Sequence, residues 1–173
     1  MKKMTVLMAI LAFFSAGWAL ADSAVVTSAV GTVQAQLGAT PARILRVGDE
    51  VVQGMTVSTG PASSVVLKFD DGQVAALTAN SRMTISAYQY QSSTRTGNVL
   101  LSLVEGGMRA ITGLIGKNSR DRVAYKAGTA TIGIRGTDVT IITTQGHVVV
   151  TVADGVISFS FAGQSLELSA GQG

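Results

Sequence analysis

The chain has 173 residues, 47% of them hydrophobic and 13% charged, with 20 glycines, 2 prolines and no cysteine. This balance differs from that of charge-rich disordered chains, and the length favours a single domain with one core. Because no disulfide can form, the fold must be held together by that core alone.

The N-terminus predicts an export signal. A short basic start is followed by an apolar run over residues 6–14 and by the small-residue site Ala19-Leu20-Ala21. We therefore expect residues 1–21 to be a helical, cleavable signal peptide and residues 22–173 to form the mature domain. A retained membrane anchor is the alternative, because residues 4–21 reach the short limit for crossing a bilayer.

Cleavage would also remove Lys2 and Lys3, which leaves 11 basic residues against 10 acidic ones. A nearly neutral domain lacks the basic stripe that attracts a phosphate backbone, so we expect no nucleic-acid partner. Export predicts a location in the periplasm or outside the cell, with no membrane span once the signal peptide is gone.

From residue 22 onward the apolar residues recur with period two, which indicates β-strands. Val65, Leu67 and Phe69 alternate with their neighbours, and Asp70-Asp71-Gly72 follows as a tight turn before a second apolar run over residues 74–77. Further strands are expected over residues 83–87, 99–103, 148–152, 157–161 and 166–168, with stops at Gly106-Gly107 and Asp154-Gly155.

No long helix is expected in the mature chain. Residues 100–115 come nearest to a helical pattern, but three glycines oppose it. The polar stretches 89–98 and 117–122 are expected to be loops. The predicted fold class is all-β, either a β-solenoid-like roll or a β-sandwich of short strands with glycine corners, and periodicity alone does not separate the two.

The stretch "ATIGIRGTDV" from Ala130 contains a break in the alternation. The apolar residues Ile132 and Ile134 are even-numbered, whereas the next apolar residue, Val139, is odd-numbered. This shift predicts a β-bulge or corner at Gly136. Arg135 would lie at that corner, either as a clamp on freed carbonyls or on a nearby carboxylate such as Asp138, or as an exposed group that binds a partner. In the first case Arg135→Ala would lower the melting temperature by a few degrees.

Three segments resemble the FecR protein domain family. They are "GDEVVQGMTVSTGPASSVVLKFDDGQVAAL" from Gly48, "GTATIGIRGTDVTI" from Gly128 and "VADGVISFSFAGQSLELSAGQG" from Val152. The resemblance covers about residues 30–173, with the three motifs in the expected order. It implies an extracytoplasmic all-β domain, as in anti-sigma regulators that relay the state of an outer-membrane transporter to a sigma factor.

The chain also departs from those regulators. Only three residues precede the apolar segment 4–21. We therefore expect no cytoplasmic segment that could hold a sigma factor, so the resemblance carries over the fold and the compartment but not the signalling role.

Few residues offer chemistry. His147 is the only histidine and follows a glycine turn, so we expect neither a catalytic base nor a zinc site. Asp70 and Asp71 could bind calcium or act as acid and base, but an aspartate before glycine is ordinary turn chemistry. We therefore name no catalytic, cofactor-binding or metal-binding residue, expect no cofactor, and leave the partner-binding residues unknown. Polar rim contacts could come from Arg109, Arg120 and Arg122.

These observations favour a non-enzymatic, exported FecR-like domain of the Gram-negative cell envelope. We expect it to bind another envelope protein through a sheet edge or corner loops. Two alternatives stay open: a small envelope enzyme that acts on polysaccharide through carboxylates, and a structural β protein that associates with itself. Carboxylates about 5–10 Å apart in an open cleft would favour the enzyme.

Overall fold

The structure is a computed structural model that describes residues 22–173. The expected signal peptide, residues 1–21, lies outside the described part. Within it, 13 strands join into one continuous sheet, and helix is limited to α1 (Leu114–Asn118) and the 3₁₀ helix η1 (Arg120–Arg122). The all-β fold class is confirmed. No helix of residues 22–173 is long and apolar enough to cross a membrane.

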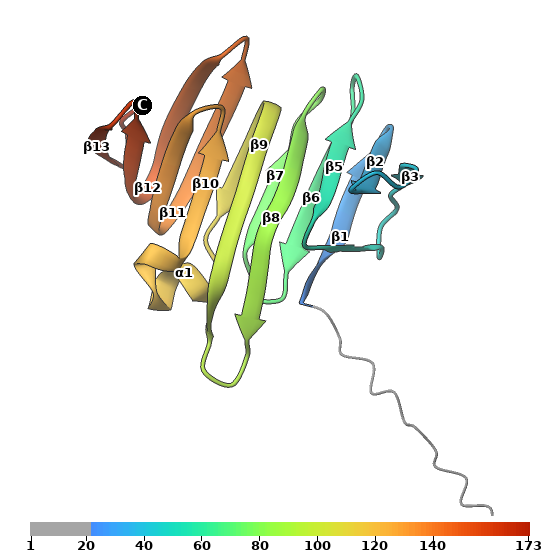
Figure 1. Ribbon diagram of the computed structural model, residues 1–173, viewed down its shortest axis with the longest axis horizontal. Coiled ribbons are helices and arrows are strands. Elements are labelled where there is room, and N and C mark those ends of the chain that lie inside the picture. The colour runs from blue at the N-terminus through green and yellow to red at the C-terminus, as the bar shows by residue number, and fades with distance from the viewer. Residues whose placement is uncertain (1–21) are drawn as a thin grey trace, which may run out of the picture.

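The sheet folds over on itself into two layers around one core (Figure 1). The first layer contains β1 (Ser23–Val30), β4 (Glu50–Val52), β6 (Ser64–Phe69) and β7 (Val74–Leu77). The second layer contains β2 (Val33–Leu37), β3 (Arg43–Ile44), β5 (Met55–Thr59), β8 (Arg82–Gln91), β10 (Val123–Ala127) and β13 (Gln164–Ser169).

Three long strands belong to both layers. They are β9 (Thr96–Ile111), β11 (Ala130–Thr144) and β12 (His147–Phe161). The first part of β9 pairs with β8 and, in parallel, with β10, whereas its last part pairs with β7 and β11. The chain therefore winds from one layer to the other while it advances from β1 to β13. The molecule combines the two expected alternatives: a roll whose layers pack face to face.

One hydrophobic cluster fills the space between the layers. Leu67 and Leu77 enter it from the first layer, Val57 and Ile85 from the second, and each is at most 1% exposed. Burial of such side chains stabilises a fold by about 1.5–3 kcal/mol each, before the cost of ordering them. The period-two pattern of the sequence thus corresponds to this one core.

Glycine corners let the long strands change layer. Gly106 in β9, Gly136 in β11 and Gly155 in β12 have φ values of +85°, +66° and +86°. At each corner the buried residues change from odd-numbered to even-numbered positions, or the reverse. In β11, Ile134 is buried before the corner and Val139 after it, with register shifts between Arg135 and Val139. The corner expected at Gly136 is confirmed.

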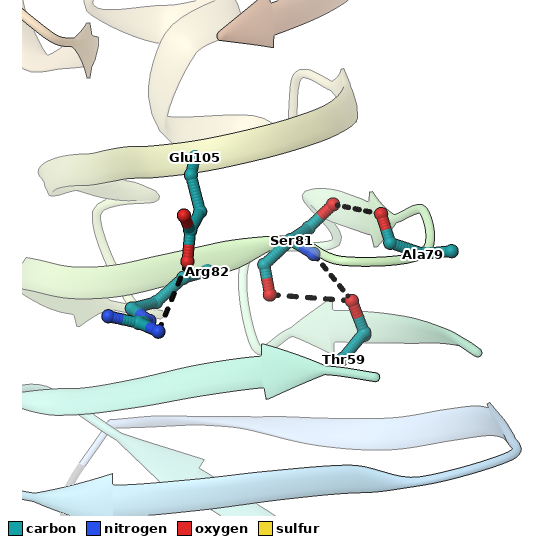
Figure 2. Close-up of polar contacts among 5 residues, drawn as sticks. All are labelled: Thr59, Ala79, Ser81, Arg82 and Glu105. Atoms are coloured by element: carbon teal, nitrogen blue, oxygen red, sulfur yellow. Dashed lines mark hydrogen bonds and ion pairs between the residues drawn. The ribbon is translucent and has the colours of Figure 1, made fainter. Parts of the chain in front are cut away.

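Buried hydroxyl groups hold the chain where β7 passes into β8 (Figure 2). The Thr59 hydroxyl accepts a hydrogen bond from the Ser81 backbone N–H at 2.9 Å and lies 2.6 Å from the Thr78 carbonyl, to which it donates. The Ser81 hydroxyl in turn accepts from the Gly107 N–H at 2.9 Å. These bonds satisfy backbone groups that the strands release where they leave one layer for the other.

Several expected boundaries were wrong. β9 does not stop at Gly106-Gly107, and β12 runs through Asp154-Gly155, because a corner bends a strand without ending its pairing. Of the expected loop 89–98 only residues 92–95 lie outside strands, since β8 and β9 pair from Gln91↔Thr96 onward. The expected loop 117–122 contains the end of α1 and all of η1.

Candidate functional site

Arg135 lies at the β11 corner and pairs with a nearby carboxylate, which is Glu167 and not Asp138. Its Nη1 is 2.8 Å from Glu167 Oε1 on β13, and its side chain is 46% exposed. No hydrogen bond joins its guanidinium to a carbonyl of the described residues, so the clamp on freed carbonyls is wrong. Arg135 pairs across two strand boundaries on the outer face of the second layer.

Asp138 is instead the partner of Arg109 on β9. The Arg109 Nε donates to Asp138 Oδ1 at 2.9 Å and its Nη2 to Asp138 Oδ2 at 2.6 Å. This two-point contact lowers the pKa of the Asp138 carboxyl and raises that of the Arg109 guanidinium. Arg109 therefore braces β9 against β11 and is not free at a rim.

One groove of about 290 Å³ contains two carboxylates. Asp138 and Asp154 are opposite each other in β11 and β12 and line it together with Ile111, Thr112, Lys117, Gly136 and Thr137. A glycoside hydrolase needs one carboxyl group that stays protonated to serve as general acid. The lowered pKa of Asp138 is the wrong direction for that role, and Arg109 contacts both of its oxygens. Asp138 therefore does not fit the role of general acid.

The expected turn at Asp70-Asp71-Gly72 is present, and Gly72 has a φ of +83°. Asp71 is nevertheless only 1% exposed. Its Oδ1 accepts the Gln73 backbone N–H at 3.0 Å, and its Oδ2 accepts the Ile115 N–H of α1 at 3.4 Å. The carboxylate thus ties the β6–β7 turn to α1. No described side chain forms an ion pair with it.

Three further polar side chains lie beside Asp71. The Tyr88 hydroxyl accepts the Asp71 backbone N–H at 3.0 Å, and the Tyr125 hydroxyl donates to Gln73 Oε1 at 3.1 Å. Burial raises the pKa of Asp71 and of both tyrosines. The Gln73 Nε2 has no partner within the described residues. Sequence reasoning missed this cluster, because an Asp-Asp-Gly turn looks the same whether it is exposed or covered by a neighbouring helix.

Other candidate residues lie on the surface. His147 is exposed at the start of β12, directly after the Gln145-Gly146 turn, as the sequence indicated. Lys117 and Arg122 are also exposed, on α1 and η1. Among residues 22–173 no three His, Asp or Glu side chains come together closely enough to hold a metal ion.

The clearest candidate binding surface is the edge formed by β12 and β13. In the described sheet β13 pairs only with β12. Leu166 on β13 is 59% exposed, and an apolar groove of about 290 Å³ lies beside it. The groove is lined by Val148, Val149, Val150, Phe159, Leu166, Leu168 and Gly173.

At the opposite edge of the described sheet, β4 pairs only with β1 and β3 only with β2, but the core behind them is closed. Leu45 is 3% exposed and closes the core beyond β1 and β2. The segment that carries it is held by an ion pair of 3.4 Å between Arg43 and Asp49, and by the Gly48 N–H, which donates to the Val26 carbonyl at 2.8 Å. The two edges therefore differ: this edge presents an ion pair together with the exposed Ile44 and Val47, whereas the β13 edge has an apolar groove beside it.

Two solved structures share this fold. Both are crystal structures of a candidate anti-sigma factor from Parabacteroides distasonis ATCC 8503, each with a TM-score of 0.51 and 15% or 16% sequence identity. Each alignment covers 66% of this chain and 51% of the other, so the match spans about half the length of those proteins. No curated protein matches the chain. The sequence profile described as FecR protein matches residues 55–158, more than half of the chain, and the chain therefore belongs to the FecR protein family.

Proposed function

We propose that the chain is an exported, non-enzymatic regulatory domain that binds another protein of the cell envelope by adding a strand of that protein to β13. Membership of the FecR family and the fold shared with a candidate anti-sigma factor support a regulatory role. The observation that carries the proposal is the β13 edge with its apolar groove.

The β13 edge has the features of a strand-addition site. A free edge presents backbone N–H and C=O groups in a row, and native proteins protect such edges with lysine, proline or a covering segment. The β13 sequence QSLELS has neither lysine nor proline, and its one charge, Glu167, is paired with Arg135. The edge is therefore open to an added strand.

The groove defines the chemistry of the partner. An added strand gains affinity from backbone hydrogen bonds, while alternate side chains enter pockets and give specificity. Leu166 and Leu168 point to the same side of β13 and line the groove with Phe159. The partner segment is therefore extended and carries apolar side chains at alternate positions.

The experiment is a comparative capture from envelope extracts. The mature chain is the bait beside Leu166→Lys, which places a charge at the groove, and Val104→Lys, which changes a residue of similar exposure on β9. We expect one envelope protein to bind the wild type and Val104→Lys but not Leu166→Lys. Hydrogen exchange should then show that this partner protects the amides of residues 164–169. A partner retained by Leu166→Lys, or a concentration-dependent dimer that occupies β13, would contradict the proposal.

A further inference from the structure

One row of polar side chains crosses the outer face of the second layer from β2 to β13. Each member is the direct cross-strand neighbour of the next. We call it the polar row: Gln36, Thr56, Thr84, Ser102, Lys126, Thr131, Ser160 and Ser165. Since neighbouring strands are about 4.8 Å apart, the row is about 34 Å long.

The polar row is almost uncharged. Lys126 is its only ionisable member. Hydroxyl groups pair across strands: Thr56 with Thr84 at 2.8 Å and Ser160 with Ser165 at 2.8 Å. These pairs fix four of the short side chains in place, so the row presents a line of hydrogen-bonding groups in which only Lys126 and Gln36 carry long side chains.

A low, mostly apolar strip runs alongside the row. It consists of Leu100, Ala124, Gly133 and Ser158, which are likewise cross-strand neighbours. Gly133 leaves no room there for a larger side chain, because a Cβ atom on it would lie 2.6 Å from the Ser158 hydroxyl. The face is thus polar along one line and smooth along the next.

At its β2 end the row enters a groove of about 490 Å³. Five hydrogen-bonding side chains line it, Gln34, Gln36, Thr56, Ser58 and Arg82, with Ala35 and Ala42. Arg82 is neutralised by Glu105, 3.1 Å away on β9 (Figure 2). Within residues 22–173 the side chains of Gln34, Gln36 and Ser58 form no hydrogen bond, so these groups are available to a ligand.

We infer that this face binds a neutral, extended polysaccharide of β-1,4-linked pyranose units that lies across the strands. The strand spacing is close to the advance of such a chain per sugar unit, so successive sugars meet successive strands. Glutamine amides offer a donor and an acceptor to neighbouring sugar hydroxyls, and hydroxyl groups offer both. The smooth strip accommodates the C–H faces of the rings.

Other ligand classes fit less well. A nucleic acid would need a row of basic groups, and the polar row has one. A protein partner would need buried aromatic or arginine anchors, which the row does not offer. Because the row lacks stacking aromatic rings, each sugar adds little, and affinity should grow with the number of sugar units that engage it.

Binding is tested with the mature chain and defined probes. Insoluble cellulose and chitin serve in depletion assays, and cellohexaose and chitohexaose in NMR titrations. We expect depletion by at least one polymer and shifts of amide signals along the polar row, stronger with the hexasaccharide than with the disaccharide. An interaction with no polymer, or shifts located elsewhere, would overturn the inference.

Variants locate the site. Thr84→Lys adds a second long charged side chain to the row, nearer its β2 end than Lys126, and Gln36→Ala removes one exposed amide with little risk to folding. Thr151→Lys is the matched control, on an exposed position of the first layer. We expect Thr84→Lys to weaken binding by at least about tenfold and Gln36→Ala by less. An equal loss in Thr151→Lys, or unchanged binding in both row variants, would contradict the inference. Leu166→Lys should leave polysaccharide binding intact, which separates this inference from the proposed function.

Discussion

Asp71 shows how much the surroundings of one carboxyl group can add to a turn. It is buried, it receives two backbone N–H groups from different elements, and it has no ion-pair partner among the described residues. We expect Asp71→Ala to lower the free energy of unfolding by about 2–4 kcal/mol, because both N–H groups would stay buried without acceptors. Urea unfolding followed by circular dichroism measures the change. Asp154→Asn is the control, since Asp154 also precedes a glycine but is exposed.

The same carboxyl group gives a pH dependence with a definite sign. Burial raises the pKa of Asp71 above its ordinary value of 3.8, so the folded protein binds this proton more readily than the unfolded chain. The contribution of this proton to the free energy of unfolding is fully present below pH 3.8. It is lost as the pH rises through the raised pKa of folded Asp71. Asp71→Asn carries no such proton. We therefore expect the stability difference between wild type and Asp71→Asn to be larger at acid pH than at pH 7. A difference that grows towards pH 7 would contradict this assignment.

Arg135 and Arg109 form a second comparison at the level of residues. The Arg135–Glu167 pair is exposed on both sides, and such pairs contribute little. We expect Arg135→Ala to change the melting temperature by less than about 2 °C, in contrast to the few degrees that the sequence alone indicated. Arg109→Ala should lower it more, because Asp138 has a side-chain exposure of only 18% and would lose both contacts. Differential scanning calorimetry tests the order, and equal shifts would contradict it.

At the level of elements, the fold depends on the glycine corners that bend the long strands from one layer to the other. Gly155 bends β12 with a φ of +86°, and a Cβ atom there would collide with the Gly136 carbonyl oxygen of the neighbouring corner. Gly163, in the β12–β13 turn, has a φ of +79° but nothing within 4 Å of its Cβ position. We expect Gly155→Ala to destabilise the protein by at least about 2 kcal/mol more than Gly163→Ala, since both lose glycine backbone freedom but only one adds a clash. Equal losses in chemical denaturation would show that the corners tolerate a side chain.

The strands could be predicted from the sequence because each has one buried side. The runs at 65–69 and 74–77 were placed correctly, since alternation and an Asp-Gly turn leave few other structures. The corner at Gly136 was also visible, because a bulge changes which positions are apolar. What the alternation could not show is whether a glycine ends a strand or bends it, because that depends on pairing with a distant strand.

Tyr88 illustrates the same limit. Strict alternation from Met83 and Ile85 puts it outside, but a register shift between Ile85 and Ala87 turns it inward against Phe69, with ring centroids 4.9 Å apart. No glycine marks this bulge, so the sequence gives no local signal. The buried cluster around Asp71 depends on that shift, and so it could not be predicted either.

For the whole molecule, stability depends on the core and on backbone pairing and hardly on charge. The ion pairs of the described residues are Arg43–Asp49, Arg82–Glu105, Arg109–Asp138 and Arg135–Glu167, and at least one side chain of each is well exposed. By contrast, the cluster between the layers contains large side chains from nearly every strand at 0–3% exposure. A chain with 13% charged residues could not be organised otherwise.

Because stability depends on the core and little on ion pairs, we predict that the melting temperature responds weakly to salt. The Debye length falls from about 30 Å at 0.01 M to about 4–5 Å at 0.5 M, which screens exposed pairs but leaves apolar burial almost unchanged. We expect the melting temperature of a chain of residues 22–173 to change by less than about 3 °C between these NaCl concentrations, because exposed pairs contribute about 0–1 kcal/mol each and screening also relieves repulsion. A large fall in calorimetry would mean that charges, and not the core between the layers, hold the roll together. Arg109→Ala provides the internal comparison: if its two-point pair is the main electrostatic contribution, the remaining salt response of this variant should be smaller than that of the wild type.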